Sequence, residues 1–489
     1  MLSAFDNFPA LLIWFPLIGG VIAFLLKQDG SVKTWAMFSS IMTLVVMGVS
    51  LLYTDPKHYL LNQVSYFWLK DLGSSFGLLL DGMSRILCLL TAISFPLIFA
   101  ATWNTNYKNT NSFYGLMLLT QCGLMGVFLA TDALVFYFFW ELALIPVYFL
   151  ASQWGGEKRI QAAFKFFIYT FAGSLLMLIG ILYIYLKTAD QSFSLFSFYN
   201  TVLSAKEQGW LFWLFFIAFA IKMPIFPFHT WQPDAYEQST TAVTMVLSGV
   251  MVKMGVFALI RWLIPLFPDA VKNYANIVIG LSVVGMIYAS CVAMVQNDLK
   301  RLVAYSSIAH IGLMSAAIFT LQPDAMQCVM IQMFNHGINI IGLWIVVELI
   351  EQQTGVRKIS ELGGVAQKAP ILAIMLVVIA LANIALPLTN AFVGEFLMFS
   401  GLFRFNAWYA AVAGLSIILA AVYTLNMIKN VFYGNTNQLT EKFREITIDQ
   451  RVILAVIVVL VFMVGVFPSP MFQLVEQATD VLFKRISAK

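Results

Sequence analysis

The sequence contains few charged residues and none of the common cofactor motifs. Only 11% of its 489 residues are charged, whereas a soluble domain has about 25%, so we expect a polytopic membrane protein. The four cysteines lie singly inside apolar runs, and no CxxC, haem or iron–sulfur spacing is present. There is no Walker loop or GxGxxG motif, and no basic patch that indicates nucleic acid. We therefore expect no cofactor in this chain.

Apolar segments follow one another along the whole sequence. At about 20 residues per span, they predict an all-α protein with about fourteen transmembrane helices in a single transmembrane domain, 1–489. The predicted spans are 9–26, 33–53, 76–102, 112–131, 133–153, 160–186, 210–231, 239–265, 274–296, 300–320, 326–350, 370–403, 408–433 and 450–476. The first span can itself serve as the insertion signal. The alternating connection 54–75 predicts a short hairpin.

Lysine and arginine are modestly enriched in the odd-numbered loops. Because such residues favour the cytoplasmic side, this bias predicts that both termini lie on the periplasmic side. The general character of the chain favours a bacterial plasma membrane.

Prolines interrupt two of the predicted spans. Pro224 and Pro227 follow Lys222 in the seventh span, and Pro387 lies inside the twelfth, which is too long for one straight helix. A helix break is tolerated in a membrane only where protein or a water-filled cavity surrounds it. We therefore predict that helices seven and twelve are discontinuous, as in the transport sites of secondary transporters.

The spacing of the two breaks predicts an internal repeat. They lie five spans apart, so helices 4–8 (112–265) and 9–13 (274–433) would run in opposite senses, as inverted repeats. Helices 1–3 (1–111) precede the repeats, and a C-terminal helix (450–476) follows them.

The central spans carry titratable side chains, although a charge at the bilayer centre costs at least about 2.5 kcal/mol. These residues are Glu141, Lys222, Lys253, His310, His336 and Glu395. The proton affinity of a buried lysine depends on whether a carboxylate lies near it, so the set predicts a proton relay. No carboxylate or cysteine stands at ligand spacing from either histidine, so we expect no metal site.

Each of these residues also has a simpler explanation. Lys222 could extend along the helix end to the membrane surface, and Glu141 could be neutral or form a static ion pair with a lysine. A single histidine on an apolar helix is usually a hydrogen-bonded core residue. Titratable groups on most of the central helices are hard to explain as packing, which favours the relay.

Several segments are similar to motifs of one known family. They are FGLLLDGMS (76–84), FFWELALIPVYFL (138–150), QAAFKFFIYTFAGSLLML (161–178), FAIKMPIFPFHTWQPDAY (219–236), DLKRLVAYSSIAHIG (298–312) and FVGEF (392–396). Over nearly its whole length, the chain resembles the antiporter-like membrane subunits of respiratory complex I. The resemblance implies a proton half-channel in each repeat and a central hydrophilic axis. The residues that match the family's proton carriers are Glu141, Lys222, Lys253, His310 and Glu395.

The resemblance also implies a function, a setting and some departures. It implies a proton-translocating, non-redox subunit of NADH:quinone oxidoreductase, with flavin, iron–sulfur clusters and quinone in partner chains. Glu395 stands where the sister chains L and N carry lysine, which favours the M-type branch, with L and N as neighbours in the lipid membrane. The family usually has proline at Thr240, glycine at Leu388 and Asn390, and often histidine at Tyr236. Two alternatives remain: a subunit of a multisubunit cation/proton (Na+/H+) antiporter, and a structural chain with fixed charges.

Overall fold

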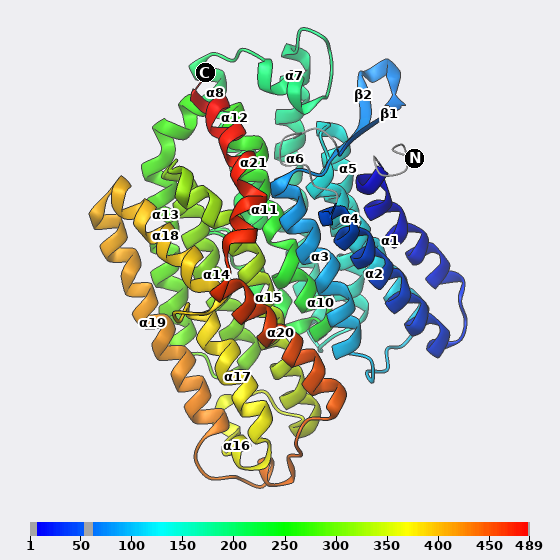
Figure 1. The fold of residues 1–489 in the computed structure, drawn as a ribbon, viewed down its shortest axis with the longest axis vertical. Coiled ribbons are helices and arrows are strands. Elements are labelled where there is room, and N and C mark those ends of the chain that lie inside the picture. The colour runs from blue at the N-terminus through cyan, green and yellow to red at the C-terminus, as the bar shows by residue number, and fades with distance from the viewer. Residues whose placement is uncertain (1–6, 53–61, 488–489) are drawn as a thin grey trace. The chain divides into compact units, whose positions relative to one another are not determined.

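Long apolar helices make up most of the structure, a computed structural model that describes residues 7–52 and 62–487. In the described ranges, twelve helices are long and apolar enough to cross a membrane. They are α1 (Phe8–Leu25), α2 (Asp29–Leu52), α3 (Gly82–Ala101), α4 (Thr110–Leu129), α5 (Ala133–Gln153), α6 (Arg159–Lys187), α10 to α12 (Thr241–Leu266), α13 (Pro268–Met294), α14 (Leu299–Phe319), α15 (Pro323–Thr354), α19 (Ala407–Phe432) and α20 (Ile448–Val466) (Figure 1).

Two further spans are broken, as predicted. The seventh consists of α8 (Ala205–Lys222) and α9 (Trp231–Gln238), and the twelfth consists of α17 (Pro370–Asn383) and α18 (Asn390–Phe405). Together with the twelve continuous helices, they give the fourteen predicted spans and confirm the fold class. In the second break, Ala385 has φ +58° and Leu388 has φ +72°. Glycine adopts a positive φ without steric cost, which explains why the family that this chain resembles usually has glycine at the position of Leu388.

The chain divides into two compact units. The first unit consists of Met1–Met223, Val250–Tyr274 and Gln473–Lys489, and the second of Pro224–Gly249 and Ala275–Phe472. In the first unit, α4 packs closely against α1 and α5. A Cβ atom on Gly123 of α4 would lie 2.5 Å from the backbone nitrogen of Ala143, so only glycine permits this close approach. In the second unit, α15 is buried along most of its length and packs against α14, α17, α18 and α20.

The predicted hairpin is present, but it extends further than the sequence indicated. Strand β1 (Gln63–Leu69) pairs antiparallel with β2 (Ser74–Leu79). The prediction that a helix begins at residue 76 is therefore wrong, because β2 covers that segment. Helix α3 begins only at Gly82, where the Asp81 carboxylate accepts a hydrogen bond from the backbone N–H of Ser84 and caps the helix. The first part of the predicted connection, 54–61, lies outside the described residues.

The last predicted span also differs. Helix α20 ends at Val466, ten residues before the predicted boundary at 476. Pro468 and Pro470 follow. A proline inside a helix has no backbone N–H to donate and clashes with the preceding turn, so α20 does not continue through them. A separate amphipathic helix, α21 (Ser469–Ser487), begins there. Among the described residues, five short helices lie in connections: α7 (Leu195–Asn200), α16 (Val365–Lys368) and 3₁₀ turns at Lys70–Leu72, Ile359–Glu361 and Thr440–Lys442.

Candidate functional site

The structure places Glu141 and Lys222 together in the first unit. Lys222 is the last residue of α8 and is only 1% exposed, so its side chain does not reach the surface of the chain. Its Nζ atom lies 5.5 Å from the ring centroid of Trp140 and 5.8 Å from that of Phe166. Aromatic faces attract a cation at such distances, so these rings help to hold the buried ammonium.

The Glu141 carboxylate lies on α5 and acts electrostatically on Lys222. The side chains of Tyr137 and Ser174 lie close to this carboxylate. Within the described residues, Glu141 Oε1 and Lys222 Nζ are buried and make no hydrogen bond. The two groups are therefore neighbours without a direct hydrogen bond, an arrangement that a small side-chain movement can change.

Lys253 lies at an irregular point of the eighth span. It is completely buried and follows a π-helical segment, Leu247–Met251. Such segments often occur at functional sites. Two residues later, a Cβ atom on Gly255 would lie 2.7 Å from the carbonyl oxygen of Phe219, so α11 (Lys253–Ala258) packs directly on α8.

In the second unit, His310 and Glu395 form a buried pair. Nδ1 of His310 on α14 lies 2.9 Å from Oε1 of Glu395 on α18. The amide of Gln332 on α15 donates a second hydrogen bond to the same oxygen, at 3.2 Å. The ring centroids of His310 and His336 are 5.6 Å apart. The second unit thus brings its three predicted proton carriers into one cluster.

Asparagines fix the helix break next to this cluster. The side-chain amides of Asn339 and Asn390 hydrogen-bond each other reciprocally, at 3.0 Å in both directions. Asn335 also donates to the backbone carbonyl of Asn390, at 2.7 Å. Because Asn390 is the first residue of α18, these bonds hold the start of the half-helix that carries Glu395. The sequence analysis missed this arrangement.

A small cavity lies beside Glu395. A cavity of about 20 Å³, enough for one water molecule, is lined by His310, Glu395 and Tyr423 among others. The Tyr423 hydroxyl donates to Ser306 Oγ at 3.0 Å, and the Asn383 amide donates to the same oxygen at 3.1 Å. The polar surroundings of the pair therefore extend from α14 to α17 and α19.

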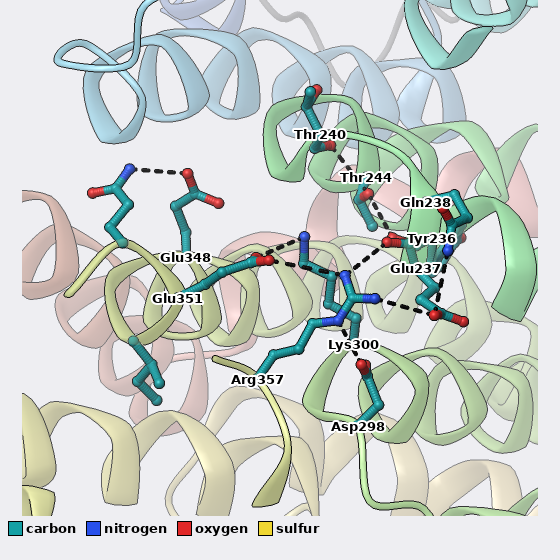
Figure 2. A network of polar contacts seen from close by, with 12 residues as sticks. Tyr236, Glu237, Gln238, Thr240, Thr244, Asp298, Lys300, Glu348, Glu351 and Arg357 are labelled. Carbon is teal, nitrogen blue, oxygen red and sulfur yellow. Dashed lines mark hydrogen bonds and ion pairs between the residues drawn. The ribbon is translucent and has the colours of Figure 1, made fainter. Parts of the chain in front are cut away.

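An ionic network joins α9 to two other helices of the second unit. Figure 2 shows the Arg357 guanidinium between Glu237, Asp298 and Glu351. Its Nε atom lies 2.5 Å from Asp298 Oδ2, and its Nη2 atom lies 3.1 Å from Glu237 Oε1. Arg301 contacts the carboxylates of Glu237 and Asp234, at 2.7 and 3.2 Å. The sequence analysis counted these arginines only as loop charges, whereas they fix the position of the short helix α9.

The first unit contains a second buried ion pair that the sequence analysis did not identify. Arg261 Nη2 lies 2.7 and 2.6 Å from the two carboxylate oxygens of Asp81. Arg261 belongs to another π-helical segment, Leu259–Leu263. The sequence predicts that Asp81 either caps a helix or pairs with Arg85, and of these two the cap is present. Because Asp81 and Arg261 are 180 residues apart, no local pattern could pair them.

Comparisons with known proteins show which family the chain belongs to. Residues 130–420 match the family model described as NADH:quinone oxidoreductase/Mrp antiporter, TM. A protein named NADH-quinone oxidoreductase subunit M, from Rickettsia bellii, is 34% identical over 464 residues, or 93% of each chain. The chain belongs to the family of NADH:quinone oxidoreductase and Mrp antiporter membrane subunits.

Solved structures show how far this oxidoreductase and antiporter family shares the fold. A chain of respiratory complex I from Thermus thermophilus with bound NADH superposes with a TM-score of 0.91 at 27% identity, over 98% of this chain and 99% of that chain. A chain of the Mrp complex from Dietzia sp. has a TM-score of 0.87 at 18% identity, over 98% of both chains. The match to the Mrp chain shows the fold alone, whereas the relative named NADH-quinone oxidoreductase subunit M is 34% identical in sequence. This chain is therefore more similar to the oxidoreductase branch of the family than to the antiporter branch.

Proposed function

We propose that this chain translocates protons as an M-type subunit in the membrane arm of a bacterial NADH:quinone oxidoreductase. The observation that carries the proposal is the set of buried titratable groups on both discontinuous spans, Lys222 at one break and the His310–Glu395 pair beside the other. The family membership and the relatives named NADH-quinone oxidoreductase subunit M support the same function.

In this proposal, the distance between Glu141 and Lys222 controls proton binding in the first unit. At an effective dielectric constant near 20, a pair at ~4 Å is stabilised by about 4 kcal/mol. Losing that energy changes a proton-binding constant by roughly three orders of magnitude. Glu141, Lys222 and Lys253 take up and release the proton in the first unit, and His310, His336 and Glu395 pass it on in the second.

The chain itself performs no redox reaction in this proposal. NADH oxidation and quinone reduction take place in partner chains that hold the flavin, the iron–sulfur clusters and the quinone. Their conformational or electrostatic changes reach this chain through the neighbouring antiporter-like chains L and N. The complex lies in the bacterial plasma membrane, with both termini of this chain on the periplasmic side.

Two substitutions test the proposal. In membrane vesicles, Glu141→Gln and Lys222→Ala should each abolish most NADH-driven proton uptake, measured with a pH-sensitive dye, while the complex still assembles. Assembly is checked by the amount of this chain that copurifies with a tagged partner. If either variant pumps protons at the normal rate, the paired carriers have no role in transport and the proposal is wrong.

The alternative function is a subunit of a cation/proton antiporter, a class that the description of the matching family model includes. Absorbance spectra of the gently purified complex distinguish the two functions. Flavin and iron–sulfur bands with NADH-dependent quinone reduction support the oxidoreductase, whereas a colourless complex that exchanges Na+ for protons supports the antiporter.

A further inference from the structure

A large open cavity lies in the first unit, outside the groups that we propose to carry protons. Its volume is about 770 Å³, and its lining residues come from α7, the start of α8, the start of α13 and the end of α21. Binding sites for small molecules typically have volumes of about 300 to 1,000 Å³. The cavity is therefore large enough for a lipid headgroup and the adjoining part of its acyl chains.

One wall of this cavity carries two adjacent cations. Lys484 is exposed and Arg485 is half-buried, and both line the cavity from α21. The guanidinium of Arg485 lies 4.3 Å from the ring centroid of Tyr199, at a typical cation–π distance. Among the described residues, neither cation forms an ion pair with a carboxylate. Two cations thus face the cavity without an anionic partner from that part of the chain.

The Tyr199 ring that supports Arg485 is itself held in place. Its hydroxyl donates a 2.6 Å hydrogen bond to the backbone carbonyl of Arg261. Burial raises the pKa of Tyr199 to about 12, so the hydroxyl stays protonated and keeps this bond at neutral pH. The Arg485 guanidinium is therefore oriented before any ligand binds, which lowers the conformational entropy that this side chain loses on binding.

The lining of the cavity also contains one carboxylate, Asp269. Its Oδ2 atom accepts a hydrogen bond from Gln208 Nε2 at 3.1 Å, and its backbone N–H donates to Gln208 Oε1 at 3.0 Å. Asp269 is thus held against Gln208 at the start of α13. With two cations and one carboxylate, the lining has a net charge of +1, which matches the single negative charge of a phosphodiester.

Nearby aromatic residues indicate the depth of the cavity in the membrane. The rings of Tyr183 and Trp210 are 4.7 Å apart, and those of Trp213 and Tyr274 are 5.1 Å apart. Tryptophan and tyrosine gather at the level of the lipid headgroups. The cavity also adjoins the first residues of α8 and α13, where apolar spans begin. Both observations place it where phospholipid headgroups lie.

We propose that this cavity binds the headgroup phosphate of a membrane glycerophospholipid. Arg485 and Lys484 bind the phosphate oxygens through charge-assisted hydrogen bonds, because a planar guanidinium fits a phosphate with two parallel donors. The acyl chains leave the cavity along its apolar residues, among them Leu203 and the 91% exposed Val202. The site is independent of the proton relay.

The experiment measures lipid binding to the purified and delipidated complex by native mass spectrometry. The probes are dioleoylphosphatidylglycerol, dioleoylglycerol, which lacks the phosphate, and inorganic phosphate. The double variant Lys484→Ala/Arg485→Ala should bind the phospholipid about tenfold more weakly or worse, because it loses two charge-assisted bonds. The control Lys442→Ala/Arg444→Ala removes two exposed cations from a loop of the second unit and should bind like the wild type.

Further measurements protect the test against loss of folding and against other occupants. Arg485→Gln keeps much of the stem that packs on Tyr199, so it should weaken lipid binding while NADH oxidation by the complex stays normal. The proposal is overturned if the double variant binds the phospholipid like the wild type, or if dioleoylglycerol or inorganic phosphate binds equally well. It is also overturned if a photo-crosslinker at position 202 captures a neighbouring protein chain instead of lipid.

Discussion

Gly465 of α20 gives the sharpest test of the second helix break, because it contacts the break without touching any titratable group. A Cβ atom on Gly465 would lie 2.2 Å from the carbonyl oxygen of Leu388 and 2.6 Å from the carbonyl carbon of Thr389. An ordinary carbon–oxygen contact is at least ~3.3 Å. In Gly465→Ala, the backbone just before Asn390 must therefore shift by about 1 Å, and α18 with Glu395 shifts too.

The expected effect has two parts. Overpacking of this kind costs about 1–3 kcal/mol of stability, and a displacement of about 1 Å in a reacting group can slow a reaction ~100-fold. Gly465→Ala should therefore lower the melting temperature of the purified complex and strongly reduce the protons pumped per NADH oxidised. Both quantities are measurable on the same preparation, by thermal unfolding and by dye quenching in proteoliposomes.

Gly414 of α19 supplies the matched control. A Cβ atom there would meet no atom within 4 Å, so Gly414→Ala should leave pumping unchanged and stabilise the helix by up to about 1 kcal/mol. If Gly465→Ala pumps and melts like Gly414→Ala, the break tolerates displacement and its geometry does not position Glu395.

Four further substitutions have expected outcomes of their own. Leu388→Gly removes about 1–2 kcal/mol of strain from the left-handed backbone conformation, at a cost of about 0.5–1 kcal/mol in chain entropy. The Leu388 side chain is 67% exposed, so its removal loses little packing, and the melting temperature should rise slightly. Asp81→Ala leaves Arg261 buried without its carboxylate and should cost about 3–5 kcal/mol, visible as poor recovery of folded protein from membranes. A Cβ on Gly394 would lie 2.5 Å from Oε1 of Gln332, whose amide donates to Glu395, so Gly394→Ala and Gln332→Leu should each slow pumping through loss of this hydrogen bond. The double variant should be no slower than the slower of the two single variants. Additive losses would contradict this shared cause.

The sequence was sufficient for the spans and the breaks because membranes impose simple rules on both. A span needs about 20 apolar residues, and Pro224 and Pro387 mark helix interruptions by removing backbone donors. The hairpin was predictable from the alternation in its first strand. Its second strand was not, because the short apolar run 74–79 fits a strand or the start of a helix equally well.

The contacts of the polar groups depend on tertiary structure, so the sequence could only nominate the participants. Glu395 and His310 were predicted, but Gln332, which donates to the same carboxylate, lies 63 residues away from Glu395 along the chain. The amide pair of Asn339 and Asn390 spans 51 residues. No local pattern distinguishes these amides from those in loops, and only the packing of α15 against α18 brings them together.

The short helix α9 has a consequence for how the protein is made. Its eight residues rise about 12 Å, far short of the ~30 Å of a bilayer core, so apolarity alone cannot insert it. Its acidic residue Glu237 is neutralised by Arg301 and Arg357, which follow 64 and 120 residues later. At about 5–20 residues per second, these partners leave the ribosome roughly 3 to 24 seconds after it. A nascent chain that stops before Arg301 therefore carries an acidic half-helix without its cations, a state that membrane proteases and chaperones can detect.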